Sequence, residues 1–182
     1  MGINFSLKDF QEYIMITNKG SRGFFEKIGR GDEYEEFKKK RDKIWNPQLE
    51  KGGHLFPGVL ETIKKVKKNY KIALTTSANR DKFMKMSADC DLISYFDFAL
   101  FREDCQAVKP DPEIYLKALE KANVSSAEAL VIEDTPRGVM SAKNAGIKVM
   151  AIPNDMTKNL DLSMADFQLN SITELPELLR SL

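Results

Sequence analysis

From Pro57 to the end of the chain, short apolar runs alternate with segments of helical periodicity, and this alternation constrains the fold most strongly. The runs with strand character are KIALTT, FDFALF, ALVIE, KVMAIP and DFQL, at residues 71–76, 96–101, 129–133, 148–153 and 166–169. Helical segments cover residues 58–69, 78–88, 112–122, 136–146 and 172–182. Short strands separated by helices of about 10–12 residues predict an α/β fold, in which a parallel sheet has helices on its faces.

The residues before this region follow a different pattern, because they are helical throughout. Ser6 and Asp9 have the spacing of a capping box, and further helices are predicted at 21–28 and 31–53. The buried stripe predicted for the last of these helices consists of Tyr34, Phe37, Arg41, Ile44 and Trp45. The lysines at 38–40 have acids nearby and indicate a solvated helix face. We therefore predict a helical domain at residues 1–53 and an α/β core at residues 54–182.

Composition excludes several classes of protein. The 182 residues carry 28 basic and 27 acidic side chains, so the net charge of +1 gives no reason to expect a nucleic-acid or membrane partner. No apolar run approaches the roughly 20 residues of a membrane-spanning helix, and the N-terminus lacks signal-peptide character. The cysteines, Cys90 and Cys105, lack metal-ligand spacing and favour a cytoplasmic location with free thiols. A single histidine argues against a Ser/His/Asp triad or a histidine-rich zinc site.

Polar side chains with related chemistry follow the predicted strands, where ligands of open α/β sheets gather. Thr76 and Ser77 end the first run, Lys109 follows the second, and Glu133 with Asp134 ends the third. Hydroxyl, backbone N–H and ammonium groups bind phosphoryl oxygens, whereas carboxylates hold Mg²⁺. Each piece alone has a plainer interpretation: Thr76 as a helix N-cap, Lys109 as a loop lysine, and the acids as a favourable start to the next helix. The spacing of about one βαβ unit between the pieces favours a single site.

On the basis of these residues, the chain resembles the haloacid dehalogenase superfamily, in its β-phosphoglucomutase-like sugar-phosphatase subgroup. ALTTSA, AVKPDPEIY and LVIEDTPRGVMSAKNAG resemble three of the four family motifs, and HLFPGVLETIKKVKK resembles the return from a helical cap. The resemblance implies a Rossmannoid core and a cap at residues 1–53. It also implies that Thr76 and Ser77 bind phosphate, that Lys109 neutralises the transferring group, and that Asp134, with Glu133 directly or through water, binds Mg²⁺.

The resemblance gives weaker indications for the rest of the substrate. Lys19 and Arg22, in the segment TNKGSRGFFEKI, are candidates for contacting its distal part from the cap. Asn79 and Arg80 stand where mutase-like members contact a second phosphate. A solvated turn and an exposed first helical turn are the plainer interpretations of these two pairs, and both alternatives stay open.

The family's first motif, a strand ending in D-x-D-x-T that supplies the aspartate nucleophile, has no match here. Asp89-Cys90-Asp91 is the D-x-D of this chain, but it follows a helix and lies between the second and third motifs, so we reject it as the nucleophile. In the family this strand is central, so we expect the strands ending at Thr75 and Glu133 to lack the neighbour between them. We also expect the chain alone to be inactive.

Three functional hypotheses follow. In the first, the intact protein is a Mg²⁺-dependent phosphomonoester hydrolase of small sugar or polyol phosphates, with a phosphomutase as the close alternative. In the second, the chain is a non-catalytic protein that binds phosphate or a partner. In the third, a separate peptide supplies the first motif. The expected ligand is a small phosphorylated metabolite, while the particular ester and the oligomeric state, with a monomer as one option, stay open.

Overall fold

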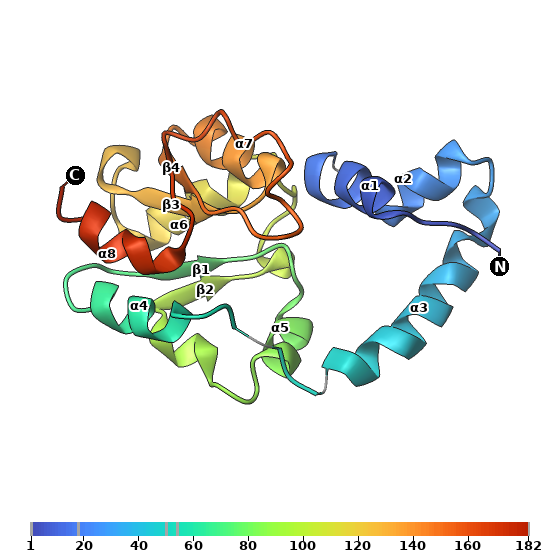
Figure 1. Ribbon diagram of the computed structural model, residues 1–182, viewed down its shortest axis with the longest axis horizontal. Helices are drawn as coiled ribbons and strands as arrows, with labels where there is room; N and C mark the ends of the chain where they lie inside the picture. The colour runs from blue at the N-terminus through green and yellow to red at the C-terminus, as the bar shows by residue number, and fades with distance from the viewer. Residues whose placement is uncertain (1, 18, 50, 54, 182) are drawn as a thin grey trace.

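The computed structural model describes residues 2–17, 19–49, 51–53 and 55–181, and consists of a helical half and an α/β half (Figure 1). The helical half contains α1 (Leu7–Phe10), the π-helix η1 (Gln11–Ile16), α2 (Gly20–Lys27), the 3₁₀ turn η2 (Gly31–Glu33) and α3 (Tyr34–Leu49). Ser6 begins this half as predicted: its hydroxyl accepts from the Asp9 N–H, and the Asp9 carboxylate accepts from the Ser6 N–H. The capping box confirms this local expectation.

An aromatic cluster holds the helical half together. Tyr13, Phe24 and Phe25 are buried in it, and Phe5, Tyr34 and Phe37 pack around them. The Phe5 and Phe24 rings meet edge to face, with centroids 4.7 Å apart and an interplanar angle of 78°, a geometry that aromatic quadrupoles favour. α1 and α2, with 4 and 8 residues, are too short to be stable alone, so we attribute their stability to this cluster.

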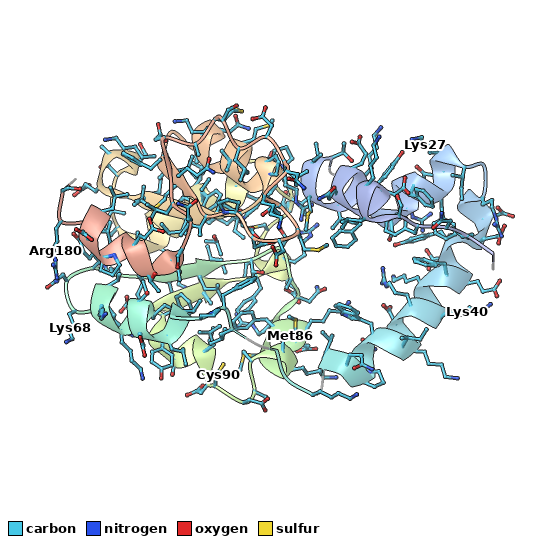
Figure 2. All side chains as sticks on the ribbon, in the orientation of Figure 1. Lys27, Lys40, Lys68, Met86, Cys90 and Arg180 are labelled. Carbon is cyan, nitrogen blue, oxygen red and sulfur yellow. The ribbon has the colours of Figure 1, made fainter. Side chains whose placement is uncertain are left out.

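The predicted inner stripe of α3 is wrong in its second half. Tyr34 and Phe37 contact the aromatic cluster, but Ile44 is 70% exposed and Trp45 is 52% exposed. The reason is geometric, because α3 extends beyond α1 and α2, and these helices do not cover Ile44 and Trp45 (Figure 1). The solvated lysine face is confirmed, since the lysines at 38–40 are exposed and Lys40, labelled in Figure 2, pairs with Glu36 at 2.5 Å.

The α/β half follows the predicted order. Its helices are α4 (Val59–Val66), α5 (Arg80–Met86), α6 (Glu113–Ala122), α7 (Pro136–Asn144) and α8 (Leu175–Leu178). Its strands are β1 (Ala73–Thr75), β2 (Phe98–Leu100), β3 (Leu130–Glu133), β4 (Lys148–Ala151) and β5 (Phe167–Gln168). Short 3₁₀ turns occur at Leu92–Tyr95 (η3), Arg102–Asp104 (η4), Ser126–Glu128 (η5) and Ile172–Glu174 (η6). Every predicted strand is present, shortened at one or both ends.

All strand pairs are parallel, but they form two sheets. In one, β1 pairs with β2 in the register Leu74 to Ala99. In the other, the order is β3-β4-β5, with Val131 opposite Val149. Within the described residues, β1 and β3 each have one strand neighbour and do not pair with each other. This arrangement agrees with the expectation that the strands ending at Thr75 and Glu133 lack the neighbour between them.

Alternation along β4 shows that helices cover both faces of its sheet. Val149 and Ala151 point into a cluster with Ile114, Val139 and other side chains of α6 and α7. Met150, between them in sequence, joins a second cluster with Val66 of α4 and Leu175 of α8. Successive side chains of a strand point to opposite faces, and β4 therefore reads as a continuous apolar run.

Hydrogen bonds between described residues join the two halves at both ends of the helical half. The Gly53 N–H donates to the carbonyl of Met86, the last residue of α5, at 2.5 Å, and Met86 is labelled in Figure 2. At the other end of the helical half, the Gln11 amide donates to the Met156 carbonyl at 2.7 Å. The predicted boundary between residues 53 and 54 adjoins His54, which lies outside the described residues, so the domain division stays a prediction. No helix within the described ranges is long and apolar enough to cross a membrane.

Candidate active site

Lys109, Tyr115 and Glu133 form the buried centre of the site. The Lys109 ammonium donates to Glu133 Oε1 at 2.5 Å, and the Tyr115 hydroxyl donates to the same oxygen at 2.6 Å. Lys109 also donates to the Tyr115 hydroxyl oxygen at 2.9 Å, which closes the triangle. The side chains of Lys109 and Glu133 are only 7% and 9% exposed, so their attraction is weakly screened.

The charges of this triangle are fixed by their surroundings. Burial raises the pKa of Glu133, but the Lys109 ammonium and the hydrogen bonds outweigh it, and the net pKa lies below its usual value. Burial and the Glu133 charge raise the pKa of the Tyr115 phenol well above its usual value. The phenol therefore stays protonated and remains a donor. Lys109 and Glu133 form a buried ion pair.

The start of α7 holds the second carboxylate oxygen of Glu133. Oε2 lies 3.2 Å from the Asp134 N–H and 3.3 Å from the Thr135 hydroxyl, which both donate to it. Thr135 is the N-cap of α7, since its hydroxyl accepts from the Gly138 N–H at 3.2 Å. A Cβ on Gly138 would overlap the Glu133 carboxylate. Both oxygens of Glu133 therefore have protein partners, and a glycine is required beside them.

Asp134 differs from its neighbour, because it has no lysine or arginine ion pair within the described chain. Burial and the Glu133 charge raise the pKa of Asp134 above its usual value. Its Oδ2 accepts from the Asn154 side-chain amide at 2.7 Å. The Arg137 guanidinium is close enough for its charge to interact with both acids, although burial lowers its own pKa. Asp134 is thus the acid of the pair that is available to a cation.

The residues fit a magnesium ion through Asp134. Mg²⁺ keeps several waters and commonly takes one or two protein carboxylates together with substrate phosphate oxygens. Within the described residues, no group of three or more acids, cysteines or histidines gathers to form a complete protein cage. Asp134 would be the residue that holds such an ion, since Glu133 is already bonded to Lys109 and Tyr115, and the ligand roles of both acids stay predictions.

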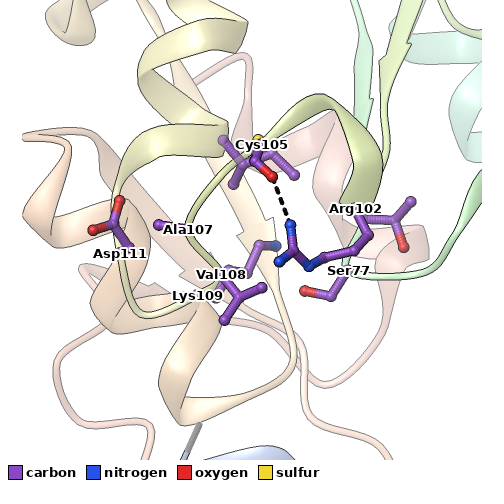
Figure 3. Close-up of a pocket in the computed structure, with 9 residues that line it drawn as sticks. Ser77, Arg102, Cys105, Ala107, Val108, Lys109 and Asp111 are labelled. Atoms are coloured by element: carbon purple, nitrogen blue, oxygen red, sulfur yellow. Dashed lines mark hydrogen bonds between the residues drawn. The ribbon is translucent and has the colours of Figure 1, made fainter.

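Thr76, Ser77 and Lys109 line one small cavity of about 10 Å³, roughly the space of a single water molecule (Figure 3). Thr76 follows β1, and its hydroxyl accepts from the Ala78 N–H at 3.1 Å. Ser77 is exposed beside it. The strand-end rule thus brings the predicted hydroxyls and the predicted lysine to the same place, although they are far apart in the chain.

Arg102 is a cation of this cavity that sequence reasoning missed. Its guanidinium donates to the Cys105 carbonyl at 2.6 Å, as the dashed line in Figure 3 shows, and to the Gln106 carbonyl at 3.4 Å. Tyr115 and Arg137 were also missed. Both lie inside quoted motifs, but only the fold shows that their side chains reach the acids. Cys105, which borders the same cavity, is buried and free.

Asn79 and Arg80 are held at the start of α5. The Asn79 amide donates to Glu103 Oε1 at 3.1 Å, and the Arg80 N–H donates to the same oxygen at 3.1 Å. The Arg80 guanidinium lies 4.2 Å from the centre of the Phe101 ring. Glu103 thus accepts hydrogen bonds from both residues. Their role in binding a second phosphate stays a prediction.

Lys19 and Arg22 are not brought to the core site. Arg22 forms an ion pair with Glu35 and lies 4.5 Å from the centre of the Tyr34 ring, both within the helical half. Lys19 is exposed before α2. Their role in substrate binding stays a prediction.

Asp89 and Asp91 are also away from the strand ends. Both are exposed and lie between α5 and η3, and a Cβ on Gly52 of the linker would overlap Asp89. This position agrees with their rejection as the nucleophile.

A parallel α/β core with a buried lysine, an acid pair and a strand-end hydroxyl defines a Rossmannoid protein suited to anionic ligands. The chain belongs to the haloacid dehalogenase-like hydrolase family, whose model matches residues 2–152. A relative described as a phosphorylated carbohydrates phosphatase, from Thermotoga maritima, is 38% identical over 122 residues, which are 64% of this chain and 55% of that protein. The chain therefore spans just over half the length of this curated relative.

Solved structures agree with the family. A crystal structure described as a "putative beta-phosphoglucomutase" from Thermotoga maritima is 34% identical, with a TM-score of 0.64 over 70% of this chain and 60% of that one. One described as a "putative phosphoglycolate phosphatase" from Lactobacillus plantarum superimposes with a TM-score of 0.80 over 97% of this chain and 84% of that one. At 20% identity the second similarity shows the fold alone.

Proposed function

We propose that this chain carries the cap and most of the active site of a Mg²⁺-dependent phosphomonoester hydrolase that acts on small sugar or polyol phosphates. The observation that carries the proposal is the convergence of Thr76, Ser77 and Lys109 on one cavity, with Lys109 bonded to Glu133 beside Asp134. The family membership and the carbohydrate-phosphate phosphatase among the relatives support it.

The roles follow from the chemistry of each group. The Thr76 hydroxyl and the Ser77 N–H donate to phosphoryl oxygens, and the Lys109 ammonium offsets negative charge on the transferring group. Asp134 holds the Mg²⁺ ion, which adds positive charge beside the same oxygens when it is bound. Glu133 orients Lys109 through the bond at 2.5 Å.

The described residues place no aspartate at the end of a strand between β1 and β3, where the family's nucleophile is expected. Hydrolysis through an aspartyl-phosphate then needs a carboxylate from a segment with the D-x-D-x-T motif. We therefore expect the 182-residue chain alone to be inactive. The cytoplasmic location stays a prediction from cysteine usage.

The test measures phosphate release from a panel of sugar and polyol phosphates with Mg²⁺. The chain is assayed alone and with a synthetic strand ending in D-x-D-x-T, and Thr76→Val serves as the site control. Hydrolysis that needs the peptide and is lost in Thr76→Val supports the proposal. Hydrolysis by the chain alone would show that another group is the nucleophile. Reading the source DNA upstream of the Met1 codon shows whether an in-frame strand with this motif exists.

A phosphomutase is the second candidate, favoured by the similarity to the structure described as a beta-phosphoglucomutase. Conversion of a sugar 1-phosphate to the 6-phosphate, in the presence of the sugar bisphosphate, separates it from hydrolysis. The third candidate is a non-catalytic phosphate-binding protein. Binding of inorganic phosphate by a cooperatively folded chain, with no turnover even when the peptide is present, would favour this candidate over both enzymes.

A further inference from the structure

A chain of three hydrogen bonds runs from the helical half to Asp134. The Gln11 side-chain amide donates to the Met156 carbonyl at 2.7 Å. The Met156 N–H donates to Asn154 Oδ1 at 2.8 Å. The Asn154 side-chain NH₂ then donates to Asp134 Oδ2 at 2.7 Å. Gln11 and Met156 are 145 residues apart in sequence, so only the tertiary structure joins them.

The Asn154 side chain has its orientation fixed by these bonds. Its carbonyl oxygen accepts from Met156, so its NH₂ group must face Asp134. Two backbone groups of Asn154 close the loop that follows it. The Asn154 backbone N–H donates to the Thr157 hydroxyl at 2.9 Å, and the Thr157 N–H donates to the Asn154 backbone carbonyl at 2.9 Å. Thr157 is fully buried, so the loop has a firm anchor in the core.

Asn154 therefore controls how the Asp134 carboxylate is turned. With Oδ2 held by the amide, rotation of the carboxylate is restricted. Groups that orient a metal ligand commonly change metal affinity 10–100-fold when they are removed.

The helical half has a second contact beside the same residue. The π-helix η1, which begins at Gln11, packs on α7, and α7 begins two residues after Asp134. Insertions of the π type are frequent at functional sites. The position of the helical half is thus linked to Asp134 through the Gln11 bond and through α7.

We propose that Asn154 is a positioning residue for the cation ligand Asp134, and that Gln11 couples the position of the helical half to that ligand. The inference rests on the proposed function, since it takes Asp134 as the metal ligand. A cap that has moved away from the core breaks the bond to Met156 and loosens the carboxylate. The affinity of the site for a cation is then expected to depend on the position of the cap.

The experiment titrates the full 182-residue chain with Mn²⁺, an oxygen-preferring stand-in for Mg²⁺. Electron paramagnetic resonance measures the free ion and the geometry of the bound ion. Asn154→Ala is expected to weaken binding by about tenfold or more and to change the spectrum of bound Mn²⁺. Gln11→Ala is expected to weaken it by about threefold, as for the loss of one modest hydrogen bond.

Two matched controls separate positioning from loop structure. Thr157→Val removes the hydroxyl that closes the loop but leaves the amide contact with Asp134, and is expected to weaken binding less than Asn154→Ala does. Asn69→Ala removes an exposed amide that precedes β1, at the opposite end of the strands, and is expected to change nothing. Circular dichroism confirms that each variant is folded.

The outcomes distinguish this inference from the proposed function. Parent affinity in Asn154→Ala, or an equal loss in Thr157→Val, would overturn the positioning role while leaving the site in place. Parent affinity in Gln11→Ala would overturn the coupling to the helical half. Unchanged Mn²⁺ binding in Asp134→Asn, or no binding by the parent chain, would overturn the metal assignment of the proposed function and this inference with it.

Discussion

Replacing Lys109 with methionine tests the charge arrangement of the site. Methionine keeps much of the length and apolar stem of lysine but removes the ammonium that bonds to Glu133 at 2.5 Å. The Glu133 carboxylate, only 9% exposed, is then left without its cation. Such a removal differs from the loss of a surface ion pair, because water cannot take the place of the missing partner.

The expected loss of stability is about 3–5 kcal/mol, the usual cost of breaking a buried pair from one side. This is a large part of the roughly 5–15 kcal/mol that stabilises a typical domain. The double variant Lys109→Met/Glu133→Gln is expected to recover most of the loss, since it removes the unpaired charge and keeps an oxygen that accepts from Tyr115.

The loss of stability in Lys109→Met is expected to depend on pH in one direction. In the parent, the lowered pKa of Glu133 contributes stability that is present above its unfolded value of 4.5 and lost as pH falls through the folded pKa. In Lys109→Met, burial acts without the ammonium, so the pKa of Glu133 rises and protonation relieves the unpaired charge. The difference between variant and parent should therefore shrink as pH falls.

The assay is urea unfolding followed by circular dichroism at several pH values. Lys40→Met is the matched control, because Lys40 pairs with Glu36 at the same 2.5 Å, yet these side chains are 57% and 61% exposed. The control is expected to lose no more than about 0.5 kcal/mol. The reasoning would be refuted if Lys109→Met cost no more than this control, or if its cost did not change with pH.

Three further predictions concern the same core. Gly138→Ala should destabilise the chain by about 1–3 kcal/mol through overlap with the Glu133 carboxylate, whereas Gly31→Ala, whose Cβ meets only ordinary contacts, should be nearly neutral in the same urea assay. Tyr115→Phe should lower the free energy of unfolding by about 1.5–3 kcal/mol, the usual value of a hydrogen bond to a charged group. A loss below about 0.5 kcal/mol, as for a surface substitution, would show that the bond at 2.6 Å contributes little. Glu113→Gln should lower the melting temperature at neutral pH. Its pKa is lowered to about 2 by a lysine and two backbone N–H groups, so the difference should fade as pH drops from 4.5 towards 2, and a constant difference would contradict it.

Much of the fold could be predicted because its signals are local. Alternation of apolar runs and helical periodicity gave every strand of the α/β half, and the Ser6 capping box gave the start of the helical half. The parallel arrangement followed from helices between strands, and the strand-end rule then placed Thr76, Lys109 and Glu133 near one another. Where the pattern failed, at Ile44 and Trp45, burial depended on whether another element lies over the helix.

The different partners of the two adjacent acids were decided by the tertiary structure. Glu133 accepts hydrogen bonds from Lys109 and Tyr115, 24 and 18 residues away in sequence, whereas Asp134 accepts one from the Asn154 amide. The link from Gln11 through Asn154 to Asp134 has no sequence signature either. Periodicity reports which face of an element is apolar, and thus determines the fold class. Hydrogen bonds between side chains that are distant in sequence form only once those faces have packed. The tertiary structure therefore decides which groups of the site bond to one another.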